Sequence, residues 1–472
     1  MQNIIKISNI RAVCQKYLAR FVGSIVPNTN MTWDSLLLAA AIALLPLFHL
    51  ILKNWTESWL VILAVLGVYG IGRYRLQFKQ LFPTPSVIWI FASLSLPLVA
   101  VFISILLRGD LKLDLWKQNV DLLNGPSRLF LAGVAFLWMN YKKVRFLDAF
   151  QIICSISIIL TIFFATRPDA GVLHDRLTTS LIDVDAFSQQ ICLLGLLQVL
   201  LLLFRPTTSR VVLVMSLISI LLAAKMGVAS NGRGGWIVIP PVLLIAAFLY
   251  KGNKLKLLSF ALFIFFGLSL MLAMNKSFYA RVTSIYSETK AWFSGDPRAG
   301  GGGRLTMWTI SWELIKQNPV KGYASKHNLW GPVYQMDSSR YLRNNFRCED
   351  ADMARIILCE TGEHNEYLHE FLNNGIFGFL AKLLLLLIPL GVFIIKLKNS
   401  GPDDYALSVI GICFVVAFMI FGITQGPFAY KFICSFYGFV MAGLNAQIFS
   451  NQDERNSLGS PASANEKRNL AA

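Results

Sequence analysis

The feature of this 472-residue chain that most limits its fold is a series of apolar runs of up to about 20 residues. Runs of this length, almost free of charge, can cross the hydrocarbon core of a bilayer, which is about 30 Å thick. A segment in lipid must satisfy its own backbone hydrogen bonds, and the runs lack the alternation of membrane strands, so they predict helices. Composition agrees, because only 15% of the residues are charged, against about 25% in soluble domains.

The runs predict an all-α membrane protein with about twelve spanning helices. They cover residues 34–52, 56–72, 86–107, 127–141, 147–166, 186–204, 211–226, 235–250, 257–275, 375–395, 405–423 and 429–448. Short clusters of Lys and Arg follow every second span, and such clusters stay in the cytoplasm. We therefore expect both chain ends inside, and outer segments at 108–126, 167–185 and 276–374.

These spans divide the chain into five parts. Residues 1–33 form a basic cytoplasmic segment without a signal-cleavage site, 34–275 hold spans one to nine, and 276–374 form a large periplasmic loop. Residues 375–448 hold the last three spans, and 449–472 form a disordered cytoplasmic tail. A loop as long as the third part is seldom structureless, so we expect it to be partly helical, with helices at 305–316 and 350–358.

Two compositional signals exclude common alternatives. The formal net charge of +17 does not indicate binding to nucleic acid, because the basic clusters lie at the ends of apolar runs. The seven cysteines show no metal-binding spacing. Cys348 and Cys359 share the large loop, which would face an oxidising compartment, and we expect a disulfide between them. Two buried thiols are the alternative.

Arginines in the outer segments are the first candidate site residues. Arg233 stands among glycines at the boundary between two spans, where a ligand could reach the backbone while the guanidinium binds phosphate oxygens. The alternative is an arginine that extends to lipid headgroups. Arg304 follows the run Gly300–Gly303, which predicts a hinge or a close-approach site, and begins a predicted helix whose amides attract anions. Arg176 has a similar setting, and a solvated loop arginine is the alternative for both.

His364 and Asn365 precede the tenth span, and a histidine there could accept a proton near neutral pH. An ordinary structural histidine is the alternative. His369 would lie about 140° around a helix from position 364, so the two histidines do not predict a helical metal pair. Two Asp-x-Asp strings, at 183–185 and 350–352, are more typical of solvated loops than of a cation site. We expect no metal and no cofactor.

Taken together and in order, these segments resemble the O-antigen ligase and O-antigen polymerase superfamily. The strongest match is His-Asn followed after nine residues by Gly-x-x-Gly, here His364, Asn365, Gly375 and Gly378. The Arg233 segment and Gly-Gly-Arg304-Leu-x-Met-Trp match two further blocks. Weaker matches to the ligase branch are Gly125-Pro126-Ser127-Arg128 and Asp175-Arg176-Leu177. The resemblance implies a GT-C-like membrane fold with one large outer loop.

The resemblance also implies an activity, that of a metal-independent, inverting glycosyltransferase at the periplasmic face of the inner membrane. Its donor would be a glycan on undecaprenyl diphosphate, and its acceptor lipid A–core oligosaccharide. Arg233 and Arg304 would neutralise the departing diphosphate, and His364 would take the acceptor's proton or orient its hydroxyl. The residues expected to bind donor or acceptor are Arg176, Arg128, Asn365 and Gly234. We expect a monomer among membrane lipids.

Two alternatives remain open at this point. A polymerase of the same superfamily would extend the glycan by its own repeat unit, but such enzymes more often carry two large outer loops. A flippase or other transporter of lipid-linked glycans is an alternative of a different class. Such a protein should show internal repeats and charges in the middle of its spans, whereas here the charges gather at the outer mouth.

Overall fold

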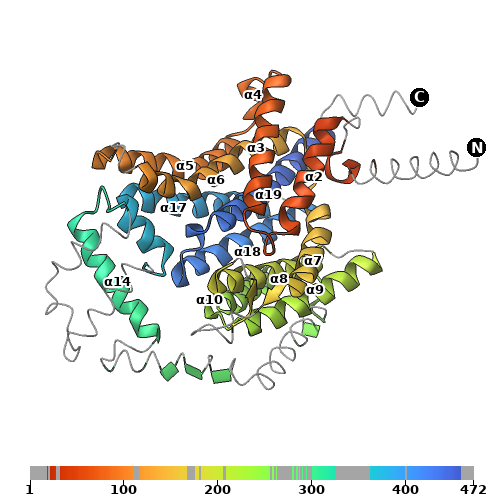
Figure 1. Cartoon of the computed structure of the whole chain (residues 1–472). Helices are drawn as coiled ribbons and strands as arrows, with labels where there is room; N and C mark the ends of the chain where they lie inside the picture. The colour runs from red at the N-terminus through yellow and green to blue at the C-terminus, as the bar shows by residue number, and fades with distance from the viewer. Residues whose placement is uncertain are drawn as a thin grey trace, which may run out of the picture.

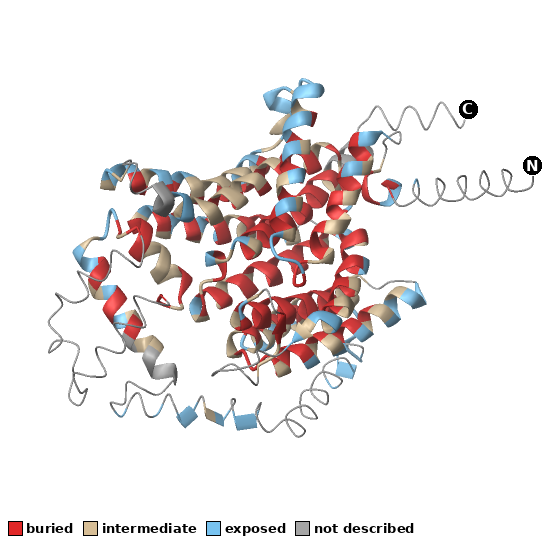
Figure 2. Ribbon diagram, in the orientation of Figure 1, coloured by how far each residue is buried: buried red, intermediate tan, exposed pale blue. Residues whose placement is uncertain are grey.

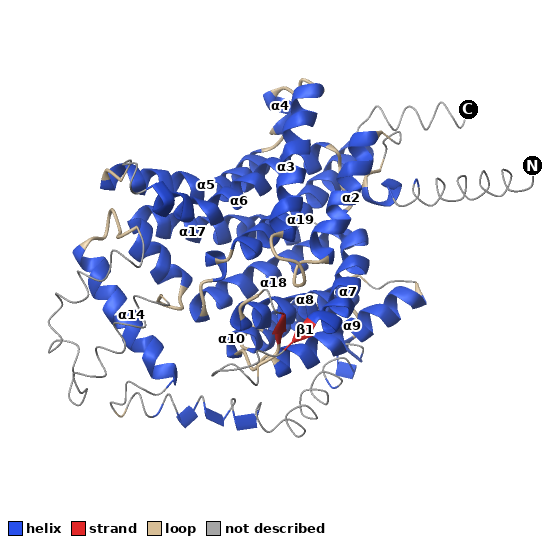
Figure 3. Cartoon of the chain, in the orientation of Figure 1, coloured by secondary structure: helices blue, strands red, loops and turns tan. Residues whose placement is uncertain are grey.

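The computed structural model describes residues 32–110, 116–166, 176–179, 182–205, 209–255, 300–324, 362–398 and 401–458, with shorter stretches within 19–27 and 258–294. Figures 1 and 3 show a bundle made almost entirely of helices. The helices are α2 (Trp33–Leu47), α3 (Trp55–Arg73), α4 (Phe78–Leu81), α5 (Pro85–Arg108), α6 (Trp116–Tyr141), α7 (Phe146–Phe164), α8 (Val184–Phe204), α9 (Arg210–Ala229), α10 (Arg233–Trp236), α11 (Ile239–Leu249), α14 (Gly300–Gln317), α17 (Glu366–Lys398), α18 (Pro402–Thr424), the 3-10 helix η4 (Pro427–Ala429) and α19 (Lys431–Leu458). Strands β1 (Ala165–Thr166) and β2 (Thr178–Thr179) form one antiparallel pair.

The helical membrane fold is confirmed, with a count that differs from the expected one. Within the described residues, 9 helices are long and apolar enough to cross a membrane: α3, α5, α6, α7, α8, α9, α17, α18 and α19. Shorter apolar helices stand where the first and eighth spans were expected, at Trp33–Leu47 and Arg233–Leu249. The ninth expected span, 257–275, falls mainly on residues outside the described part, so the count of twelve stays a prediction.

Several boundaries differ from those expected. Helix α6 begins at Trp116 rather than at 127, because the polar residues before its apolar run are helical too. Helix α19 continues to Leu458, past the expected end at 448. The helix expected at 305–316 is confirmed, but it begins at Gly300, so the glycine run belongs to the helix and the predicted hinge is wrong. The helix expected at 350–358 lies outside the described residues.

The centre of the bundle is formed by α8, α18 and α19, whose apolar residues are mostly buried (Figure 2). Small residues bring the helices close: a Cβ at Gly438 of α19 would lie 2.5 Å from the Cβ of Ala132 in α6. Such close packing is typical of membrane helices, which gain little from the hydrophobic effect when they associate in lipid. Helices at the rim instead expose apolar side chains, for example Phe248 at 87%. A lipid environment accounts for this exposure.

Two basic residues at helix ends, Lys142 and Arg205, form ion pairs at the same end of the bundle. Lys142, at the end of α6, forms an ion pair of 2.6 Å with Asp34 at the start of α2. Arg205, after α8, pairs with Asp148 of α7, also at 2.6 Å. The ion pairs join helix ends that lie opposite to the beginning of α17. Lys142 and Arg205, from two of the clusters expected to face the cytoplasm, therefore share one end of the bundle.

Helix α17 changes direction at Gly375. This glycine has φ 63° and ψ −160°, values that an L side chain rarely adopts. The break frees backbone groups that bond to the segment after α14: Tyr323 N donates to Leu372 O at 2.8 Å, and Ile376 N donates to Pro319 O at 2.8 Å. Ser104 of α5 donates to Asn374 O at 2.6 Å. The first turns of α17 are thus a separate segment, set by its neighbours before the apolar part begins.

We expect Gly375→Ala to destabilise the protein strongly. An added Cβ would lie 2.0 Å from Val320 O, and the backbone conformation would also be strained. The thermal unfolding midpoint of the purified protein in detergent measures the effect. Gly391→Ala is the matched control in the same helix, because a Cβ there has no atom within 4 Å, and it should change stability by no more than about 1 kcal/mol. Equal midpoints for the two variants would contradict the role given to the break.

Candidate active site

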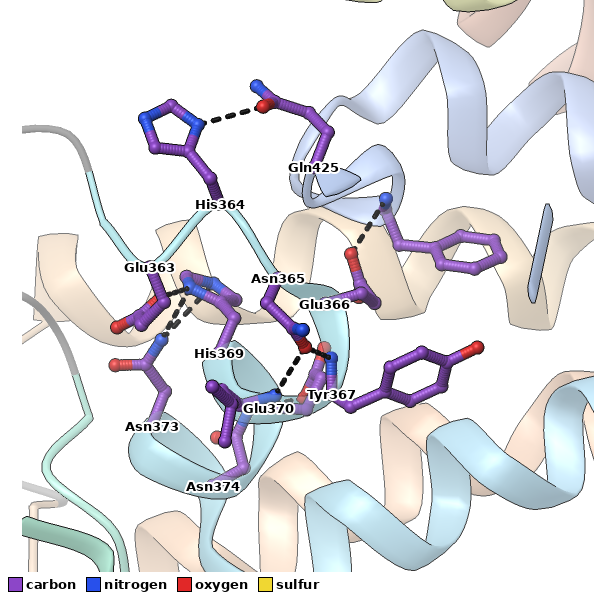
Figure 4. Close-up of polar contacts among 12 residues, drawn as sticks. Glu363, His364, Asn365, Glu366, Tyr367, His369, Glu370, Asn373, Asn374 and Gln425 are labelled. Atoms are coloured by element: carbon purple, nitrogen blue, oxygen red, sulfur yellow. Dashed lines mark hydrogen bonds and ion pairs between the residues drawn. The ribbon is translucent and has the colours of Figure 1, made fainter. Parts of the chain in front are cut away.

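His364 lies just before α17, where this helix meets the end of α18. Its φ of 49° is in the left-handed region, which is uncommon for a residue other than glycine and occurs often at functional sites. The Nδ1 atom of His364 lies 2.8 Å from Oε1 of Gln425, the residue that follows α18 (Figure 4). The ring points away from the side chains of Glu363, His369 and Glu370 at the start of α17. The imidazole is half-buried and has a defined orientation.

Asn365 provides the local reason for this geometry. Its Oδ1 accepts hydrogen bonds from the backbone N–H groups of Tyr367 (3.0 Å) and Leu368 (3.1 Å), so it caps the first turn of α17. Its Nδ2 donates to Ile423 O of α18 at 3.4 Å. Asn365 therefore stabilises the position of His364. Its expected contact with substrate stays a prediction.

The arginine-bearing segment 230–236 packs against α8 and the end of α18. A Cβ at Gly235 would lie 2.5 Å from Ser188 O, and one at Gly234 would lie 3.3 Å from Gln189 Nε2 and from Thr424 Oγ1. These glycines therefore allow helices of the protein itself to approach. Arg233, at the start of α10, donates from Nη2 to Ser284 Oγ at 2.9 Å. Because Thr424 directly precedes Gln425, this segment adjoins the His364 contact.

Arg176 is held at the same end of the bundle. Its Nε donates to Ser230 O at 3.0 Å, and its guanidinium forms an ion pair with Asp185 of α8. Asp183, two residues earlier, accepts hydrogen bonds from the backbone N–H groups of Asp185 (2.9 Å) and Ala186 (3.3 Å). The Asp-x-Asp string therefore caps a helix and pairs with an arginine, which explains it without a bound cation.

Helix α14 brings Arg304 toward His364. Trp308 donates from its indole Nε1 to Glu363 O at 2.9 Å, the carbonyl that precedes His364 in the chain. Arg304 is one helical turn before Trp308, so both side chains leave the same face of α14. Figure 1 shows α14 beside the beginning of α17. Helix α14, from the segment expected to be the large loop, therefore lies beside the candidate site.

Arg128 lies within α6, inside the span expected at 127–141. One turn earlier, a Cβ at Gly125 would lie 3.1 Å from Phe428 O and 3.2 Å from Cys434 Sγ, so this part of α6 packs against η4 and α19. The Nε of Arg128 is buried and has no hydrogen-bond partner among the described residues. A buried N–H without a partner costs stability, and an anionic ligand would satisfy it.

A buried ion cluster at the start of α17 was not expected. Lys382 Nζ lies 2.9 Å from Glu366 Oε1 and 3.0 Å from Glu370 Oε1, with the lysine and Glu366 almost completely buried. The other oxygen of Glu366 accepts from the backbone N–H of Phe428 in η4 at 3.0 Å (Figure 4), and Lys382 lies over the ring of Phe428. The sequence did carry a signal, because Lys382 is a charge within an apolar run.

The two histidines have separate partners, in agreement with their expected separation. His369 Nδ1 lies 2.9 Å from Glu363 Oε2, and Asn373 Nδ2 approaches the same ring (Figure 4). In the part of the chain that the structure describes, no group of three or more His, Cys, Asp or Glu residues could hold a metal ion. The second Asp-x-Asp string and the expected pair Cys348–Cys359 lie outside the described residues.

Tyr430, also not expected, directly follows η4. Burial raises the pKa of its hydroxyl, and the negative charge of Asp183 raises it further.

We expect Lys382→Met to destabilise the protein by about 3–5 kcal/mol, because two carboxylates would remain buried without their cation. Thermal unfolding of the purified variant measures this. Lys225→Met is the control, since Lys225 is an exposed lysine in another span. Adding Glu366→Gln and Glu370→Gln to Lys382→Met should recover part of the loss. Wild-type stability of the single variant would contradict the cluster's role.

Comparison with known proteins finds a family match in the segment that contains three of the candidate site residues. Residues 218–383 match the family model described as O-antigen ligase. They include Arg233, Arg304 and His364, whereas Arg128 and Arg176 lie before them. An uncharacterized protein of Haemophilus influenzae is 27% identical over 218 residues, which are 45% of this chain and 52% of that relative, so the chain spans about half of its length. The resemblance seen in the motifs is therefore confirmed over residues 218–383, the segment that is similar to the O-antigen ligase family model.

Proposed function

We propose that this protein is an O-antigen ligase, which transfers a glycan from undecaprenyl diphosphate to lipid A–core oligosaccharide. The observation that carries the proposal is the place of the family segment in the fold. Within residues 218–383, α10, α14 and the start of α17 bring Arg233, Arg304 and His364 to one end of the bundle. Two arginine cations at the same end of the bundle as a half-buried imidazole suit a reaction in which a hydroxyl attacks and an anion leaves.

The reaction would proceed by direct displacement. The acceptor hydroxyl oxygen forms a bond to the anomeric carbon of the donor sugar while the bond from this carbon to the diphosphate oxygen breaks, with inversion. The hydroxyl proton passes to His364, and the electron pair leaves with undecaprenyl diphosphate. Arg233 and Arg304 stabilise the negative charge that develops on the diphosphate, because guanidinium groups donate two hydrogen bonds to phosphate oxygens. The donor's diphosphate supplies the driving force.

Arg176 and Arg128 would extend this cationic region. Arg176 already has Asp185 as a partner, so its net contribution to an incoming diphosphate is smaller. Arg128 has a buried Nε without a partner among the described residues, so it gains more from an anion. We assign Arg128 to donor binding and Arg176 to the stabilisation of the segment that bears Arg233.

The positions of the charges support a periplasmic site in the inner membrane. Lys142 and Arg205 end their helices at the side of the bundle opposite to His364. Clusters of this kind remain in the cytoplasm, which supports a position of His364 and the arginines on the outer side. Lipid-linked donors and core lipid could then reach the site from the outer leaflet.

A transporter of lipid-linked glycans is the competing class, and one observation bears on it. Charges do occur inside a span, at Lys382, Glu366 and Glu370. They form ion pairs with one another and tie α17 to η4, so they have a structural use that needs no substrate pathway. The enzyme therefore remains the better explanation of His364 and its neighbours.

Purified protein with a defined undecaprenyl-diphosphate-linked glycan should transfer the glycan to core lipid A. Mass spectrometry of the products measures this. We expect glycan on core lipid and little elongation when a repeat-unit acceptor is offered instead. Elongation without transfer to core would identify a polymerase. Movement of the intact donor across vesicles without any product would favour the transporter.

Arg304→Ala and Arg233→Ala should each lower the transfer rate by at least about 10²-fold, since each removes a cation from the developing charge. Arg304→Lys should restore little, because a lysine cannot donate in the forked geometry of a guanidinium. Initial rates with purified, folded variants measure this. Arg210→Ala, at an exposed position that begins α9 at the opposite end, is the control. Near-normal turnover of both site variants would refute the role in diphosphate stabilisation.

A further inference from the structure

Arg108, the last residue of α5, joins three parts of the chain that are far apart in the sequence. Its Nε forms an ion pair of 2.6 Å with Oδ2 of Asp110. Its Nη1 donates to Lys321 O at 2.9 Å, in the segment after α14, and to Asn373 O at 3.1 Å, next to the break in α17. Only 8% of the arginine side chain is exposed, so the guanidinium is held in place within the fold.

The contacts of Arg108 belong to a set that caps the break in α17. Asn373 O accepts from Arg108 and also from Ala324 N, at 2.9 Å. The next carbonyl, Asn374 O, accepts from the hydroxyl of Ser104 at 2.6 Å. Ser104 is one turn before Arg108, so both side chains leave the same face of α5. Helix α5 therefore fastens the break, and with it the segment after α14, to the membrane bundle.

Helix α14 is attached to its surroundings near both ends. Trp308, in its first half, donates to Glu363 O at 2.9 Å. After its last turn, Lys321 O accepts from Arg108. Between these points one face of the helix is buried and packs against α17, through Met307, Ile310 and Leu314. Two attachments and a packed face fix the direction of α14, and Arg108 supplies the attachment that leads to α5.

The direction of α14 decides where Arg304 lies. Arg304 is in the first half of the helix, and Gln317, its last residue, is about 20 Å further along the axis. A tilt of about 3° at the end near Arg108 would move Arg304 by about 1 Å. A displacement of this size at a reacting centre can cost about 10²-fold in rate. Figure 1 shows α5, α14 and α17 on the same side of the bundle.

We propose that Arg108 is a positioning residue, which fixes the direction of α14 and thereby the place of Arg304 relative to His364. Arg108 acts through the helix and needs no contact with the substrate. The consequence for catalysis rests on the proposed function, in which Arg304 stabilises the departing diphosphate. The anchoring of α14 by Arg108 does not depend on that function.

The anchoring can be measured without any glycan. Hydrogen exchange of the purified protein in detergent, read by mass spectrometry, reports how often the backbone bonds of Tyr323 N and Ala324 N open. We expect the peptide that contains residues 319–324 to exchange about 10-fold faster in Arg108→Gln than in the wild type, because the variant loses charge-assisted hydrogen bonds. Peptides from α18 and α19 should keep their exchange rates.

Arg205→Gln is the matched control for that experiment. Arg205 also lies at a helix end and pairs with an aspartate at 2.6 Å, but at the opposite end of the bundle. This variant should leave the exchange of residues 319–324 unchanged. Unchanged exchange of these residues in Arg108→Gln would overturn the proposal. An equal rise throughout the chain would overturn it as well, since Arg108 would then support the whole fold and not α14 in particular.

Transfer rates give a second test. Arg108→Gln should lower kcat about 10-fold or more with an unchanged KM for the lipid-linked donor. If Arg108 acts through Arg304, adding Arg108→Gln to Arg304→Ala should cost no more than about a further 2-fold. With Arg233→Ala, on α10, the two losses should multiply. Losses that multiply in both pairs would refute the action through Arg304. A wild type without transfer but with the expected exchange pattern would instead refute the proposed function alone.

Discussion

The ion pairs of Lys382 with two glutamates connect the two halves of α17 and hold them against η4. Glu366 and Glu370 belong to the turns of α17 before its break, and Lys382 belongs to the apolar part after it. The backbone of Phe428 joins the cluster through Glu366. A charge inside a membrane bundle is stable only with its partners in place, so the cluster sets both halves of α17 against η4. Gln425 and Tyr430 flank η4, and their positions follow from it.

Most helices that contribute to the candidate site contribute an end rather than a middle, whereas Arg128 lies within α6. Gln425 follows α18, Asp183 precedes α8, Arg233 begins α10 and His364 precedes α17. Helix ends carry unpaired backbone groups, which polar side chains or ligands must satisfy. A lipid-covered bundle concentrates such groups at its two surfaces, and here the ion pairs of the basic clusters occupy one surface while the candidate site occupies the other. The polar groups lie at the two ends of the bundle because lipid covers its sides.

Most of the helical fold could be predicted from the sequence, because hydropathy is a local signal, whereas the roles of the candidate site residues stay predictions. The helix at Gly300–Gln317 and the position of His364 before α17 agree with expectation. The contact of Gln425 with His364 could not be predicted, since it joins residues far apart in the chain. Lys382 could have been noticed as a charge in an apolar run, but its partners lie on turns that the expected span, which began at 375, left out.

The backbone pairing between the segment after α14 and the break in α17 has a consequence for how this chain can tolerate changes in length. Ala324 N donates to Asn373 O at 2.9 Å, next to the bond from Tyr323 to Leu372. The two segments that flank residues 325–361 are therefore held side by side by their own backbone hydrogen bonds. The entropy of closing such a connection grows only slowly with its length. Insertions and deletions between the anchors can accumulate during evolution, or be introduced as reporter tags, while the geometry around His364 is preserved.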